Sequence, residues 1–204
     1  TNIIRGFTFW RRNHLDDYLE KIIEKFQKPV EIIESEDMIL GIENEPSTFV
    51  GNGKELALFL DRLDSKSVKA IWDPGNDLWD PSGETPYPEG YEYVKGKIIH
   101  VHIKDGIRKG RSGKPEWVAF GKGEVNYQDQ FRALYEDGYR GYLSLETHWR
   151  LGKQLSEDLV SKPGGEEFTG LGKYASEICM RSLLKMLAKL KIKNCQEDDD
   201  QRNK

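Results

Sequence analysis

Four residues with metal-binding side chains stand at or near the ends of short apolar runs: Glu43, Asp73, His102 and Glu146. Asp73 follows Glu43 by 30 residues, and His102 follows Asp73 by 29. Three carboxylates that are buried together cannot all stay ionised unless a cation compensates them. We therefore interpret the four side chains as the ligands of one divalent metal ion.

Oxygen-rich ligation with a single imidazole suits a fairly hard cation. We expect Mn²⁺ first, with Mg²⁺, Co²⁺ or Zn²⁺ as alternatives. The competing interpretation is that each acidic residue caps a helix or lies in a solvated loop, and that His102 is an ordinary sheet residue. The agreement of all four positions in register favours the metal site.

The apolar runs that carry these residues have the length and composition of β-strands. The predicted strands are Ile3–Phe9, Met38–Glu43, Val68–Asp73, Ile98–Lys104 and Tyr142–Glu146. Because successive side chains of a strand point to opposite faces, the aliphatic residues can pack under helices while the polar residues share the other face.

Helical patterns lie between and after the strands. The predicted helices are His14–Phe26, Gly53–Leu63, a short one at Glu89–Val94, Tyr127–Tyr135 and Tyr174–Leu190. We expect Pro29 to break or restart the first helix, and Asn52 to cap the second. A Gly-rich insertion at residues 106–123 is expected to form a long loop.

Strand–helix alternation predicts an α/β fold with a parallel sheet. The spacing of about 30 residues matches the repeat of a (β/α)8 TIM barrel, roughly 31 residues per unit. Five predicted strands leave a closed eight-stranded barrel three strands short, so we expect an incomplete barrel. Residues 1–190 would form these five βα units, and residues 191–204 a polar, disordered tail.

The bulk composition excludes several classes of protein. A formal net charge of −4 disfavours nucleic acid as a partner. No apolar run approaches the roughly 20 residues of a membrane helix, and no signal segment opens the chain. The two cysteines, Cys179 and Cys195, do not suggest a disulfide framework and favour a cytoplasmic setting. We expect no membrane partner and leave a homo-oligomer open.

The sequence resembles the xylose isomerase-like TIM barrels, specifically the sugar phosphate isomerase/epimerase group. The stretches that carry the resemblance are LGIENEP, AIWDPGN, IIHVHIKD and GYLSLETHW. The resemblance implies the same four metal ligands, with Glu43 and Glu146 as the acid/base pair. It also implies that Arg108 contacts substrate oxygens. Because IRGFTFW resembles the fourth strand of the family, the resemblance further implies strands 4 to 8 with their helices, the first three βα units being missing. Asn76 stands where sugar epimerases of the family often carry a histidine, which puts a standard ketose 3-epimerase in doubt.

The expected function is isomerisation or epimerisation of a sugar, sugar phosphate or polyol, with proton transfer by the glutamates through an enediolate that the metal stabilises. The candidate substrate-binding residues are Trp10, Asn76, Lys104, Arg108 and His148. For two of them a plainer interpretation stays open, in which Lys104 pairs with a carboxylate and His148 faces solvent. Gly121–Gly123 is a weaker candidate for a phosphate cradle.

Three alternatives to an isomerase or epimerase remain. A metal-dependent dehydratase of a keto-polyol would use the same site. A five-strand piece with raw sheet edges would be non-catalytic, or would need assembly with another chain. An apurinic endonuclease shares the barrel but needs more histidine ligands than the four present, and the acidic charge is wrong for DNA.

Overall fold

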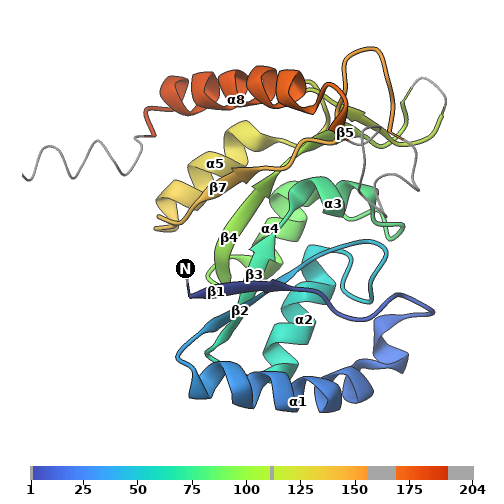
Figure 1. Ribbon diagram of the computed structural model, residues 1–204, viewed down its shortest axis with the longest axis vertical. Helices are drawn as coiled ribbons and strands as arrows, with labels where there is room; N and C mark the ends of the chain where they lie inside the picture. Colours follow the sequence, from blue (N-terminus) through green and yellow to red (C-terminus); the bar gives the residue numbers. More distant parts are fainter. Residues whose placement is uncertain (1, 111–112, 156–168, 193–204) are drawn as a thin grey trace, which may run out of the picture. The chain divides into compact units, whose positions relative to one another are not determined.

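The computed structural model describes residues 2–110, 113–155 and 169–192 (Figure 1). The chain divides into two compact units. The first unit is drawn from residues 1–103 and 141–144, and the second from residues 104–140 and 145–204. Residues 193–204 lie outside the described ranges, so the expectation of a disordered tail stays a prediction.

The first unit is built on a parallel half-barrel of five strands in the order β1-β2-β3-β4-β7. The strands are β1 (Ile3–Gly6), β2 (Ile39–Glu43), β3 (Val68–Trp72), β4 (Ile98–Ile103) and β7 (Leu143–Leu145). Each lies within one of the predicted runs. The expectation of an α/β fold with a parallel sheet is thereby confirmed.

Strand register places the predicted ligands Glu43, Asp73 and His102 on one face of this sheet. Glu43 pairs with Ile71, and Ile71 pairs with His100 on the next strand. Asp73 and His102 follow two residues after these positions and therefore share the same face. The opposite face carries Ile42, Ala70 and Val101, all of which are fully buried.

Four helices accompany the described part of this sheet. They are α1 (Leu19–Ser35), α2 (Gly53–Leu63), α3 (Pro74–Trp79) and α4 (Tyr91–Val94). The predicted cap of α2 is confirmed, because Asn52 Oδ1 accepts a hydrogen bond of 2.8 Å from the Glu55 N–H.

The expectation that Pro29 breaks the first helix is wrong, since α1 continues through it. Phe26 and Ile33 stand on either side of Pro29, seven residues apart, and both are buried. Packing of this shared face offsets the hydrogen bond that proline cannot make. The helix also begins later than expected, because Leu15–Asp17 forms a separate 3-10 turn, η1.

The second unit contains a two-stranded antiparallel sheet, β5 (Asp105–Ile107) with β6 (Glu116–Val118). The described residues of the Gly-rich insertion are therefore partly strand, where a loop was expected. The unit's helices are α5 (Tyr127–Glu136) and α8 (Gly172–Lys189), both close to the predicted bounds. Cys179 on α8 is fully buried, as a small apolar group would be.

No helix among the described residues combines the length and apolar character that crossing a bilayer would require.

Candidate metal site

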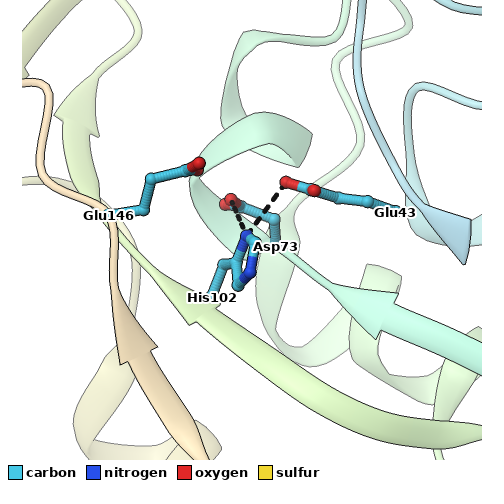
Figure 2. Close-up of side chains that lie close together, drawn as sticks. All are labelled: Glu43, Asp73, His102 and Glu146. Atoms are coloured by element: carbon cyan, nitrogen blue, oxygen red, sulfur yellow. Dashed lines mark hydrogen bonds and ion pairs between the residues drawn. The ribbon is translucent and has the colours of Figure 1, made fainter. Parts of the chain in front are cut away.

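Three of the four predicted ligands meet within the first unit (Figure 2). His102 Nδ1 lies 3.1 Å from Glu43 Oε1 and 3.8 Å from Asp73 Oδ2. One ligand atom from each residue falls within 4.8 Å of the other two. Glu43 and Asp73 are fully buried and His102 is 8% exposed. Two buried carboxylates around one imidazole form a donor set that a divalent cation would compensate.

The carboxyl ends of neighbouring strands bring these side chains together. Glu43 is the last residue of β2, Asp73 comes directly after β3, and His102 is the penultimate residue of β4. In a parallel sheet these ends lie along one edge, where active sites of α/β barrels are built.

Asp73 caps a helix and also faces the candidate metal site, so both roles that the sequence left open for it apply. Its Oδ1 accepts a hydrogen bond of 3.0 Å from the Asn76 N–H and so caps α3. Its Oδ2 faces His102. Because the two oxygens point to different partners, capping the helix orients the carboxylate toward the candidate site.

Asn44 is a supporting residue that the sequence reasoning missed. Its Oδ1 accepts from the Asp73 N–H at 2.8 Å, and its Nδ2 donates to the Asp73 carbonyl at 2.9 Å. This buried amide thus adds two hydrogen bonds between the end of β2 and the end of β3. The only signal in the sequence was its position directly after Glu43.

Asn76 lies beside Glu43 and is 3% exposed. Its Nδ2 donates to Glu43 Oε1 at 3.3 Å and to the Asn44 carbonyl at 2.8 Å. The first contact holds a candidate ligand and the second holds the residue that follows it, so support of Glu43 is the role that this geometry favours. Contact of Asn76 with substrate remains a prediction.

Arg5 on β1 is a second residue that the sequence reasoning missed. Its Nε donates to Glu43 Oε2, the oxygen turned away from His102. The Arg5 side chain is 43% exposed although its partner is fully buried, and its guanidinium lies 4.8 Å from the centre of the Phe7 ring. A charged residue within the apolar run IIRGFTF was the available signal.

His100 supports His102 from the same strand face. Its Nε2 lies 2.8 Å from Ser144 Oγ, and its ring meets the His102 ring edge to face, with centres 5.4 Å apart. Burial, followed by the nearby His102, lowers the pKa of His100 below its ordinary value of 6.5. A neutral His100 adds no positive charge beside the candidate cation.

Glu146 and Lys104 belong to the second unit, where they form an ion pair. Lys104 Nζ donates to Glu146 Oε2 at 2.6 Å, and the Lys104 side chain is 2% exposed. Tyr127 fixes the Lys104 backbone by accepting from its N–H at 3.2 Å and donating to its carbonyl at 2.5 Å. The plainer expectation for Lys104, pairing with a carboxylate, is confirmed.

The remaining predicted substrate-binding residues are Trp10, Arg108 and His148. Trp10 is 68% exposed in the first unit and bridges to Thr48. In the second unit the Arg108 N–H donates to Glu124 Oε2 at 2.8 Å, and the His148 ring meets the Trp117 ring edge to face at 4.8 Å. Their roles toward a substrate remain predictions.

The glycines proposed as a phosphate cradle bind a side chain of the protein itself. The N–H groups of Gly121 and Gly123 each donate to Asp105 Oδ2 at 2.9 Å. Asp105 is 2% exposed, and burial raises its pKa while these hydrogen bonds oppose the rise. The cradle holds a carboxylate that organises the β5–β6 segment, which argues against phosphate binding there.

The sequence of this chain is similar to those of known proteins. The family model described as "Xylose isomerase-like TIM barrel" matches residues 1–163. An inosose dehydratase of Clostridium perfringens is 25% identical over 144 residues, which cover 62% of this chain and 46% of that protein. The chain thus spans about half the length of this curated relative.

Two solved structures share the fold. A xylose isomerase domain protein from Planctomyces limnophilus is 18% identical with a TM-score of 0.65, and the match covers 92% of this chain and 60% of that one. The IOLI protein, solved with a bound zinc atom, is 13% identical with a TM-score of 0.64, and the match covers 92% and 63% of the two chains.

Proposed function

Because the chain belongs to the xylose isomerase-like TIM barrel family, we propose that it is a divalent-metal-dependent enzyme that moves a proton within a small hydroxy-carbonyl substrate. The favoured reaction is isomerisation or epimerisation of a sugar, sugar phosphate or polyol. The family includes proteins named as epimerases and as dehydratases, so fold alone does not choose between these reactions.

The observation that carries the proposal is the buried set of Glu43, Asp73 and His102. Within one unit, two carboxylates that are inaccessible to solvent face the same imidazole nitrogen. Burial of two negative groups side by side is costly without a cation. Metal ligation requires donor atoms from several residues to converge on one point, and one ligand atom from each of these three residues lies within 4.8 Å of the other two.

We propose Glu146 as the fourth ligand. Ser144 on β7 belongs to the first unit and contacts His100 on the face that carries the ligands. Glu146 follows Ser144 by two residues, so strand alternation gives both side chains the same facing. It also comes directly after β7, as Asp73 comes directly after β3.

In this proposal the two glutamates transfer the proton and their neighbours hold them in place. A bound cation supplies Lewis acidity, which polarises a carbonyl and acidifies the adjacent C–H. Glu43 or Glu146 removes that proton, and the same or the other glutamate returns it to the opposite face or to the neighbouring carbon. Arg5 and Asn76 orient Glu43, and Lys104 orients Glu146. We propose Mn²⁺ as the metal, with Mg²⁺, Co²⁺ or Zn²⁺ as alternatives.

Two measurements test the proposal. Elemental analysis of protein purified without chelator should find about one divalent metal per chain, and a content below about 0.2 would contradict the site. Incubation of the metal-loaded protein with ketoses and ketose phosphates in D₂O should then introduce solvent deuterium at the carbon next to the carbonyl. Protein treated with a chelator is the matched control and should show no exchange above background.

Similarity to an inosose dehydratase supports a second candidate function, the dehydration of a keto-polyol. Both reactions begin with the same proton abstraction, and they differ in whether a β-hydroxyl then leaves. Inosose should be included in the D₂O experiment. Release of a product with the absorbance of a conjugated enone would favour dehydration, whereas deuterium exchange without such a product would favour epimerisation.

A further inference from the structure

We propose that Arg5 is a substrate-binding residue and that the substrate carries an oxyanion, either a carboxylate or a phosphate. This inference rests on the proposed metal-dependent function and narrows its substrate class. It concerns a residue outside the four-ligand set, on the strand at the edge of the described sheet.

The position of Arg5 suits recognition of a group that arrives from solvent. Register pairs Arg5 with Gly41, two residues before Glu43 on the same strand face. Its Nε contacts Glu43 Oε2, so the guanidinium lies directly beside the candidate metal ligands. The Arg5 side chain is 43% exposed, whereas its partner Glu43 is fully buried.

The guanidinium is held in a defined orientation. The Glu43 carboxylate fixes its Nε, and the Phe7 ring lies 4.8 Å from its central carbon. Contact with an aromatic ring and a fixed hydrogen bond both reduce the conformational entropy that an arginine loses on binding. A planar, pre-oriented guanidinium is the side chain best matched to carboxylate and phosphate groups.

Formal charge in the first unit also favours an anionic substrate. Glu43 and Asp73 carry two negative charges, and a divalent cation would neutralise both. Arg5 then leaves this part of the site with a formal charge of +1. In the second unit the Lys104–Glu146 pair is neutral by itself. A neutral sugar would leave this net charge of +1 in place, whereas one oxyanion would balance it.

Ligand titration of the Mn²⁺-loaded full chain tests this inference. Three small probes are compared by calorimetry: glycolate, inorganic phosphate and the neutral diol ethylene glycol. Wild type should bind glycolate or phosphate at least tenfold more tightly than ethylene glycol, and the preferred anion identifies carboxylate or phosphate as the group. Arg5→Met should remove most of this preference, and Arg5→Lys should restore part of it.

Arg12→Met is the matched control, because it removes the same charge from an exposed position on the same segment. Equal losses of anion binding in both Met variants would mean bulk electrostatics and would overturn the inference. So would anion binding by Arg5→Met that equals wild type. Mn²⁺ titration is run first on every variant. Wild type that binds no Mn²⁺ contradicts the proposed function instead, and Arg5-dependent anion binding is then judged on the metal-free chain.

Discussion

Asn44 hydrogen-bonds to the backbone of Asp73 through both ends of its side-chain amide, at 2.8 Å and 2.9 Å. A buried side chain thus takes the place of backbone hydrogen bonds between β2 and β3 at the ends of these strands, where the candidate metal site lies. The contact links the stability of the strand ends to the geometry of the ligands, since Glu43 immediately precedes Asn44.

Asn44→Ala should weaken both folding and metal binding. The substitution leaves the buried Asp73 N–H without its partner, at a cost of about 1–3 kcal/mol. It also removes one of two hydrogen bonds to the Asp73 carbonyl, which still accepts from the Asp77 N–H at 3.2 Å. Loss of such supporting contacts typically lowers metal affinity about 10–100-fold. Urea denaturation and Mn²⁺ calorimetry measure the two effects. Asn13→Ala, at an exposed position, should change neither the stability nor the Mn²⁺ affinity. An Asn44→Ala protein with wild-type Mn²⁺ affinity would show that the Asn44 hydrogen bonds do not position the ligands.

Glu146→Gln should reduce turnover by about 10²–10⁴-fold, the usual contribution of a general base or acid. Most of the metal should stay bound, because Glu43, Asp73 and His102 are unchanged. Initial rates on whichever substrate shows deuterium exchange, together with metal content by elemental analysis, separate the two effects. Glu24→Gln, whose side chain is 73% exposed, is the matched control. Near-normal turnover by Glu146→Gln would remove Glu146 from the acid/base pair.

Much of the fold was predictable because strand and helix patterns in this chain are local. Apolar runs of five to seven residues marked the strands, and Asn52 marked the start of α2. The effect of Pro29 was misjudged because the helical hydrogen bond that proline cannot make is evident from the local sequence. The packing of Phe26 and Ile33, which offsets that loss, depends on the tertiary structure. The β5–β6 pair was missed because its strands have only three residues each and give no periodic signal.

The candidate site was predictable to the extent that it depends on strand ends. Glu43, Asp73 and His102 could be placed on one edge by counting residues along parallel strands. The contacts of Asn44 and Arg5 could not, because they depend on side-chain rotamers and on register between strands. The same limit applied to Gly121 and Gly123, whose carboxylate partner Asp105 is 16 and 18 residues away in the chain.

Asn52→Ala should lower the free energy of unfolding by about 2–3 kcal/mol. Loss of the cap on α2 costs roughly 1 kcal/mol. The Asn52 amide also donates to Oδ1 of the buried Asp80 at 3.1 Å and to Oγ of the exposed Ser82 at 3.2 Å. The Asp80 carboxylate therefore loses one of its hydrogen bonds as well. Asn52→Asp, which keeps the cap but replaces this donor with an acceptor beside Asp80, separates the two terms. Equal unfolding midpoints for Asn52→Ala and wild type in urea would contradict the expectation.

Asp77 gives the first unit a pH dependence that metal binding does not require. Burial, followed by the charge of Glu84 and a hydrogen bond to it, raises the pKa of Asp77 from 3.8 to about 9. The pKa of Glu84 is raised as well, chiefly by burial. With a proton on Asp77, its Oδ2, which accepts no hydrogen bond within the described part of the chain, becomes a donor toward the Glu84 carboxylate.

The folded state therefore holds a proton that the unfolded chain releases near pH 4, and stability should fall as pH rises from about 4 to 9. One such proton contributes a slope of at most about 1.4 kcal/mol per pH unit. Asp77→Asn removes it, so the variant should gain stability relative to wild type between pH 5 and pH 8. Urea denaturation at both pH values measures this gain, with the exposed Asp16→Asn as control. A wild-type protein whose stability is flat over this range, or an Asp77→Asn protein that keeps the full slope, would show that Asp77 is ionised in the fold.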